Sequence, residues 1–240
     1  MKKLLFWLAA LISTFLVGIG VVAFLLFDLN IDPQVSPPAP FRSECAESSS
    51  FPGLSVAIPA IERGKSGYFP KNTWRLYNEE DNSTNDWYGS PLRAFNETSL
   101  LDNSDESREI YRFLWLRSFN NPVVVLVERS KKGASVYSKE LNGGSGNSPV
   151  KIINEFKRDL SESEWCDFLR SVERAKFWAM PDTKDDLGVD GSRWVLEGVK
   201  DGRYHLVDRF TPTTGEFRKA CIYMLNLSGV DTEKLKDELY

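Results

Sequence analysis

The chain has 240 residues, 42% of them hydrophobic, and a formal net charge of −4. A chain of this length can bury a substantial core without disulfides or metals. Because nucleic acids are bound by basic surfaces, an acidic chain whose charges are interspersed predicts no nucleic-acid partner. The sequence contains no P-loop, no G-x-S-x-G and no C-x-x-C motif, so we expect no cofactor and no metal site.

The N-terminus predicts a membrane anchor. Lys2 and Lys3 precede an apolar run, Leu4 to Phe27, that no charged residue interrupts. About 20 apolar helical residues cross a hydrocarbon core of roughly 30 Å, so this run can span a lipid bilayer. The preceding lysines favour a cytoplasmic N-terminus and an extracytoplasmic domain. The alternative is a signal peptide cleaved after Ala23, which would release a secreted protein.

Three segments follow from this interpretation. Residues 1–27 are the transmembrane signal-anchor, and residues 28–53 are rich in Pro and Ser without a hydrophobic period. Such a stretch lacks the apolar surface that offsets the entropy of ordering, so we expect an extended tether. Residues 54–240 predict a single folded domain outside the cytoplasm.

This domain is predicted to be α+β. Runs of β-branched and aromatic residues predict strands at 110–119, 123–128, 134–140 and 150–156, and a further hairpin at 193–199 and 203–210. The connections are too short for the crossovers that parallel strands need, so the sheet should be antiparallel.

Two helices should cover one face of that sheet. Ser161 and Glu164 form a capping-box signature, followed by Trp165, Phe168, Leu169 and Val172 at helical spacing. A second helical pattern starts near Thr214 and stops at Gly229. Residues 54–101 are rich in aromatic side chains but show no period, which predicts packed irregular structure.

The chain has three cysteines, Cys45, Cys166 and Cys221, too few and too scattered for a disulfide framework. Cys166 and Cys221 fall in the two predicted helices. We interpret both as small core residues, and a bridge between the helices is the alternative.

The C-terminal half contains three distinctive segments: ESREIYRFLWLRSFNNPVVV (106–125), LSESEWCDFL (160–169) with the following FWAMP, and DGSRWVLEGVKDGRYHLVDRFTP (190–212). These segments resemble a family of uncharacterised bacterial membrane-anchored or secreted proteins. An arginine-rich strand, a tryptophan helix and a W-x-L-E-G hairpin recur in that order in the family. The resemblance implies a bacterial envelope protein and this order of elements, and it implies no activity.

The only histidine provides the one catalytic hypothesis. If Lys200-Asp201-Gly202 forms a three-residue loop, Glu197 lies opposite His205 at about 5 Å between Cβ atoms. A histidine oriented by a carboxylate can act as an acid or base near neutral pH. Arg203 and Arg209 would share the face of His205 and could bind a carboxylate or phosphate. The alternative is an ordinary strand with paired side chains.

Two more clusters have a functional and a structural interpretation. Arg112, Arg117 and Arg129 could bind phosphate or glycan, or could be solvated ion-pairing residues on an open sheet face. Trp74, Trp87 and Tyr88 could stack on a sugar, or could anchor the core.

Taken together, the sequence favours a single-pass envelope protein whose non-enzymatic domain binds another protein or a cell-wall component. The alternative is an envelope hydrolase that uses Glu197 and His205.

Overall fold

The computed structural model describes residues 56–64, 66–74, 83–103, 105–143, 150–183, 188, 190–232, 235 and 239. The chain separates into residues 1–42 and 43–240, and every described residue belongs to the second part. The predicted anchor (1–27) and tether (28–53) therefore lie outside the described residues. Within the described part, no helix is long and apolar enough to cross a membrane.

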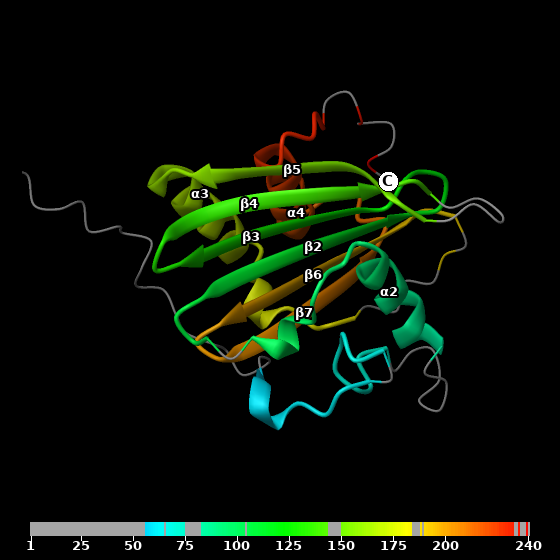
Figure 1. Cartoon of the computed structure of the whole chain (residues 1–240), viewed down its shortest axis with the longest axis horizontal. Helices are drawn as coiled ribbons and strands as arrows, with labels where there is room; N and C mark the ends of the chain where they lie inside the picture. Colours follow the sequence, from blue (N-terminus) through cyan, green and yellow to red (C-terminus); the bar gives the residue numbers. More distant parts are fainter. Residues whose placement is uncertain are drawn as a thin grey trace, which may run out of the picture. The chain divides into compact units, whose positions relative to one another are not determined.

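A seven-stranded antiparallel sheet forms the centre of the domain (Figure 1). The strands are β1 (Val56–Ala57), β2 (Glu109–Arg117), β3 (Val123–Ser130), β4 (Gly133–Leu141), β5 (Ile152–Leu160), β6 (Ser192–Lys200) and β7 (Arg203–Phe210). Their spatial order is β1-β7-β6-β2-β3-β4-β5. The predicted meander and the predicted second hairpin are both confirmed, and the hairpin pairs with the free side of β2.

The helices are α2 (Ser83–Ala94), α3 (Glu162–Arg174) and α4 (Glu216–Leu227), with short 3-10 turns η1 (Ile58–Ala60), η3 (Leu100–Asp102) and η4 (Phe177–Ala179). In Figure 1, α3 and α4 lie behind the sheet and α2 lies in front of it. The α+β class is confirmed, whereas the expectation of two helices on one face is incomplete. The helix α2 contains Gly89 and Pro91, which are disfavoured in helix interiors. For this reason the sequence pattern did not predict a helix there.

The helix α3 begins at the predicted capping box. Ser161 Oγ accepts a hydrogen bond from the backbone N–H of Glu164 at 3.3 Å, and Glu164 Oε2 accepts one from the N–H of Ser161 at 2.8 Å. A hydrogen-bonded ion pair with Arg158, followed by the bonds from Ser161, lowers the pKa of the Glu164 carboxyl to about 2. The carboxylate is therefore charged at ordinary pH and favours the positive end of the helix dipole.

Each face of the sheet carries its own apolar core. On β2, Tyr111, Phe113 and Trp115 belong to the core under α3 and α4, whereas Leu114 and Leu116 belong to the core under α2. Because both faces are covered, the central strands are buried along most of their length and do not alternate between apolar and polar residues.

Candidate functional site

The turn between β6 and β7 is one residue shorter than predicted. Lys200 pairs with Arg203, so only Asp201 and Gly202 form the loop, with φ angles of 49° and 67°. Asp-Gly favours such a two-residue turn because both positions need positive φ. The register then pairs Gly198 with His205.

This register separates the two predicted catalytic residues. Glu197 pairs with Leu206, and His205 pairs with Gly198. Directly opposed residues share a face and neighbours along a strand alternate, so the side chains of Glu197 and His205 project from opposite faces of the sheet. The predicted Glu197–His205 pair is therefore wrong.

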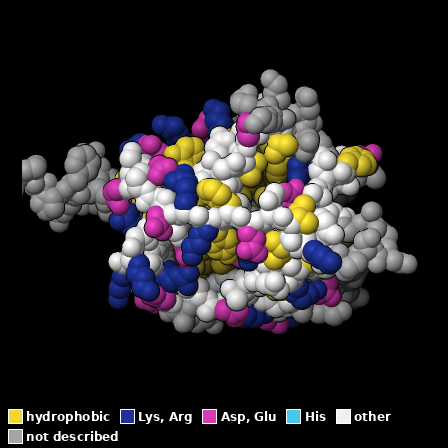
Figure 2. Space-filling model, turned by 45° about the horizontal axis from the view of Figure 1, so that its top comes forward, with side chains coloured by type: hydrophobic (Ala, Val, Ile, Leu, Met, Phe, Trp, Pro, Cys, Tyr) yellow, Lys and Arg dark blue, Asp and Glu magenta, His cyan; other side chains and the backbone are white. Residues whose placement is uncertain are grey.

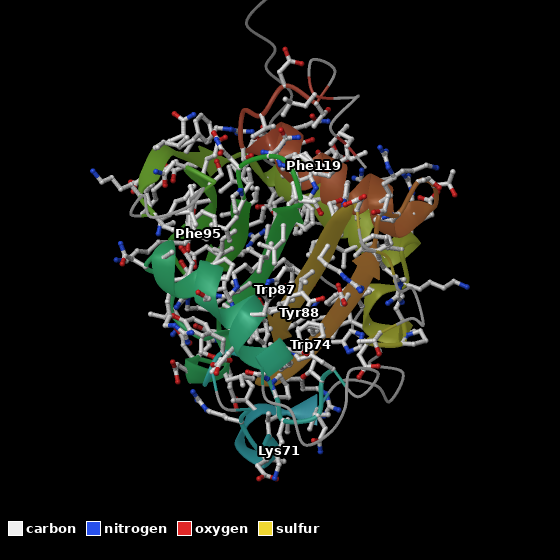
Figure 3. The ribbon with its side chains drawn as sticks, turned by 90° about the vertical axis from the view of Figure 1, so that its right-hand side faces the viewer. Lys71, Trp74, Trp87, Tyr88, Phe95 and Phe119 are labelled. Carbon is white, nitrogen blue, oxygen red and sulfur yellow. The ribbon has the colours of Figure 1, made fainter. Side chains whose placement is uncertain are left out.

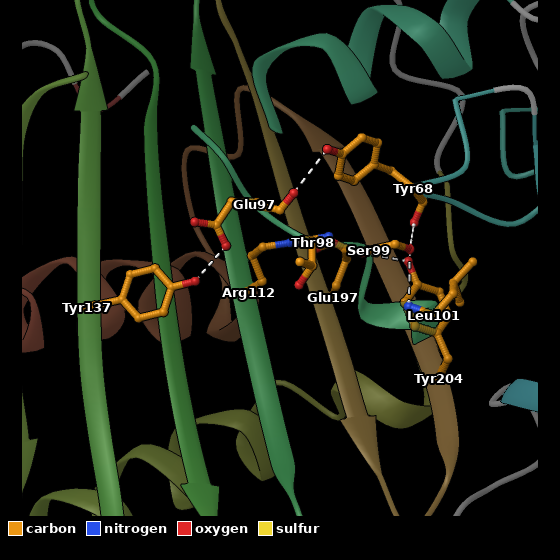
Figure 4. Close-up of polar contacts among 9 residues, drawn as sticks. All are labelled: Tyr68, Glu97, Thr98, Ser99, Leu101, Arg112, Tyr137, Glu197 and Tyr204. Carbon is orange, nitrogen blue, oxygen red and sulfur yellow. Dashed lines mark hydrogen bonds and ion pairs between the residues drawn. The ribbon is translucent and has the colours of Figure 1, made fainter. Parts of the chain in front are cut away.

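Glu197 belongs to a buried polar network on the α2 face (Figure 4). Its Oε2 accepts a hydrogen bond from Arg112 Nε at 2.7 Å, and both side chains are 0% exposed. Its Oε1 accepts one from the Tyr204 hydroxyl at 2.9 Å, and Arg112 Nη1 donates to the carbonyl of Thr98 at 2.7 Å. Burial, reinforced by Glu197, raises the pKa of Tyr204 well above its usual value, so the hydroxyl stays a donor.

Glu97 extends this network towards β4. Its carboxylate accepts hydrogen bonds from the Tyr137 hydroxyl at 2.5 Å and from Lys139 Nζ at 2.7 Å. The Tyr68 hydroxyl donates to the Glu97 backbone carbonyl at 3.0 Å (Figure 4). These bonds tie the chain between α2 and η3 to the sheet, which assigns Glu97 and Glu197 structural roles.

His205 lies on the opposite face, against η4. Its ring centroid is 5.0 Å from that of Phe177 and 6.1 Å from that of Trp178. Its Nε2 is 3.0 Å from the carbonyl oxygen of Met180, a distance at which Nε2–H donates. Burial lowers the pKa of the imidazole, so His205 is neutral near pH 7.

The two arginines predicted to bind an anion lie apart. Arg209 is buried and donates hydrogen bonds to the carbonyls of Pro181 at 2.8 Å and Asp182 at 3.2 Å. Arg203 is partly exposed at the hairpin end. They are six positions apart along β7, roughly 20 Å, too far to clamp one carboxylate or phosphate.

A cleft with a volume of about 420 Å³ adjoins His205. It is lined by residues 70–73, residues 181–183 and residues 204–206 of β7, together with Val56 and Ile61. Lys71 Nζ donates to the Glu62 carboxylate at 2.7 Å, and Thr73 Oγ1 donates to the carbonyl of Pro70 at 2.8 Å. Its size suits a small ligand, but the hydrogen bonds of these side chains and of His205 go to neighbouring protein groups.

The three arginines considered for phosphate do not converge on one site. Arg112 is fully buried, so the expectation that it is solvated is wrong; α2 and η3 cover this face of the sheet. Arg117 donates to the carbonyl of Asn121 and stacks on Trp115 with 4.1 Å to the ring centroid. Arg129 forms a partly exposed ion pair with Glu162 at 2.8 Å.

The aromatic residues near α2 divide into two groups (Figure 3). Trp74 and Tyr88 are buried and stacked, with ring centroids 3.9 Å apart, which confirms them as core anchors. Trp87 packs edge-on against Tyr88 but is 56% exposed. One exposed ring does not make a sugar-stacking platform.

The described residues contain no group of three or more His, Cys, Asp or Glu side chains arranged to hold a metal ion. The sequence matches no protein-family model and no curated protein.

The two helix cysteines differ in their oxidation state. Cys166 is disulfide-bonded, whereas Cys221 is a buried free thiol whose pKa is raised by burial. Both residues are buried in the core, as interpreted, and the alternative of a bridge between them is wrong because Cys221 is a free thiol. The remaining cysteine of the sequence, Cys45, lies outside the described residues.

The edge strand β5 carries an exposed apolar surface that sequence reasoning did not single out. All residues from 153 to 157 are exposed, including Ile153 at 52% and Phe156 at 39%. Figure 2 shows hydrophobic side chains gathered on this side of the molecule. A hollow of about 450 Å³ adjoins the strand, and its lining includes Phe156, Val230 and Leu235.

The backbone of β5 also presents unpaired groups. Ser130 and Gly133 close a two-residue loop, so the even-numbered residues of β4 direct their backbone groups to β5. The pairs Ser138–Phe156 and Val136–Arg158 then place the backbone N–H and C=O of Glu155 and Lys157 on the outer edge. Within the described part of the chain, no strand pairs with that edge and no other backbone group bonds to it.

Proposed function

We propose that the protein is a single-pass bacterial envelope protein whose extracytoplasmic domain binds a protein partner through the outer edge of β5. The observation that supports this most directly is the long edge strand with outward-facing backbone groups and exposed apolar side chains. A free strand edge pairs with another extended chain through backbone hydrogen bonds, and the side chains supply specificity.

The proposed location draws on two separate features. The apolar run Leu4–Phe27 is long enough to anchor the chain in a bilayer. The disulfide at Cys166 supports an oxidising environment, because disulfides persist outside the cytoplasm and are rare within it. Both features favour a domain on the outer side of the membrane.

No observation favours the hydrolase as a second function. It requires Glu197 to orient His205, and these side chains project from opposite faces of the sheet. Each is already hydrogen-bonded to another group, Glu197 to Arg112 and His205 to Met180.

The location makes a testable prediction about thiols. We expect one alkylated cysteine, Cys221, when the full-length protein is denatured without reductant, and three after reduction, counted by intact mass. The matched control Cys221→Ser should lower the two counts to zero and two. Three reactive thiols before reduction would contradict the disulfide and remove its support for an oxidising compartment.

The binding surface can be tested by site-specific photo-crosslinking. A photoreactive phenylalanine analogue at position 156, in the full-length protein in native membranes, should form an adduct with a protein. The same analogue at position 119 is the matched control, because Phe119 is a more exposed aromatic residue, at 74%, in the connection between β2 and β3. No adduct from position 156, or equal adducts from both positions, would refute the edge as the binding surface.

A further inference from the structure

We infer that the partner at the β5 edge is the β5 edge of a second copy of this chain, so that two sheets join into one continuous antiparallel sheet. This inference rests on the proposed function and names its partner. The order of charges along β5 is complementary to itself when the strand is reversed.

Symmetry limits the ways in which two β5 strands can pair. Identical antiparallel strands in one sheet are related by a two-fold axis, and the residue on that axis faces its own counterpart. With Phe156 on the axis, Glu155 faces the second copy's Lys157, and Lys157 faces the second copy's Glu155. Both residues direct their backbone groups outward, so each facing pair can exchange two backbone hydrogen bonds.

The charges select this register over its neighbours. An axis at Glu155 would place two glutamates in direct opposition, and an axis at Lys157 would oppose two lysines. Like charges directly across a strand pair are destabilising, whereas opposite charges stabilise it. The axis at Phe156 forms two opposite-charge pairs and also places Asn154 opposite the second copy's Arg158.

The apolar surface supports the same register. The Phe156 ring lies against Gly229 at the end of α4, where a Cβ on the glycine would be 3.3 Å from the ring. On the axis, the two Phe156 rings face each other beside the hollow that Val230 and Leu235 help to line. Pairing would therefore cover exposed apolar surface of both copies. Anchoring both chains in one membrane raises their effective concentration, so a small interface suffices.

Cysteine crosslinking tests the register directly. Residues that face each other in a non-hydrogen-bonded antiparallel pair have Cα atoms about 4.5 Å apart, a distance that a disulfide can bridge. Full-length Phe156→Cys in membranes, treated with a mild oxidant, should therefore form a covalent dimer. The control Ile153→Cys should form none, because its counterpart lies roughly 20 Å away along the strand. The unmodified chain under the same oxidant measures the background.

Charge-reversal variants distinguish specific pairing of the two strands from crosslinking by random collision. In the Phe156→Cys background, Glu155→Lys or Lys157→Glu turns both opposite-charge pairs into like-charge pairs and should lower the dimer yield about tenfold. The double reversal Glu155→Lys/Lys157→Glu restores opposite charges and should restore the yield. If the charges serve only to guard the edge against pairing, the double reversal gives no higher dimer yield than the single reversals. That result, or dimer yields in the single variants equal to that of Phe156→Cys alone, would overturn the inference.

The outcomes for the function and for the dimer are distinguishable. A photo-adduct from position 156 with twice the chain mass supports both. An adduct of any other mass, with no Phe156→Cys dimer, overturns the second copy as the partner while the edge remains a binding surface. No adduct and no dimer overturn both.

Discussion

Glu197→Ala should destabilise the domain by about 3–5 kcal/mol, because it leaves the Arg112 guanidinium buried without its counter-charge. The two side chains are 0% exposed and joined by a 2.7 Å hydrogen bond. The Tyr204 hydroxyl also donates to Glu197 and would lose its acceptor. The free energy of unfolding can be measured by urea titration of the purified protein in mild detergent, followed by tryptophan fluorescence.

The surface pair Arg129–Glu162 provides a matched control. It joins the same residue types at 2.8 Å, but its side chains are 35% and 45% exposed. Exposed pairs contribute about 0–1 kcal/mol, so Glu162→Ala should have a small effect. The double variant Arg112→Met/Glu197→Leu should lose less than Glu197→Ala, since it leaves no unpaired charge. Equal losses for Glu197→Ala and Glu162→Ala would refute the structural role of the buried pair.

Phe168→Ala should destabilise the domain by about 3–5 kcal/mol, because it opens a cavity between α3 and the sheet. Phe168 is fully buried, with its ring centroid 5.2 Å from that of Tyr111 and 5.8 Å from that of Trp165. The same urea titration measures the change in unfolding free energy.

Its control lies on the outer face of the same helix. The Arg170 side chain is 57% exposed and pairs with Asp167 on the surface. Arg170→Ala should change the unfolding free energy by no more than about 0.5 kcal/mol. A similar loss in both variants would refute the contribution of Phe168 through packing between α3 and β2.

Local signals account for the elements that the sequence predicts well. The capping box at Ser161 and Glu164 satisfies orphan N–H groups within one helical turn, so it acts without the rest of the fold. The strand runs likewise depend on neighbouring residues, and both hairpins form, although the β6–β7 turn is one residue shorter than predicted. The helix α2 depends on packing of Tyr88 and Leu92 against the sheet, which overrides the preferences of Gly89 and Pro91.

The predicted Glu197–His205 pair does not form because the β6–β7 turn, a local feature, sets the face of the sheet on which each side chain lies. A turn shorter by one residue shifts the register by one, and the side-chain period of a strand is two. Glu197 therefore packs with Arg112 under α2, and His205 packs with Phe177 under η4. The sequence Asp201-Gly202 is a signal for a two-residue loop that could have favoured the observed register.

By itself, the sequence determined strands β2 to β7, helices α3 and α4 and the antiparallel class of the sheet, because periodicity, capping and turn chemistry act between residues close along the chain. Only the tertiary structure decided which faces are covered, which charges are buried and which edge is free. Those properties depend on strand order, which joins the β6–β7 hairpin to β2 and leaves the outer edge of β5 without a neighbouring strand among the described residues. The exposed apolar side chains and the self-complementary charges of β5 can form a binding surface only because β5 lies at the edge of the sheet.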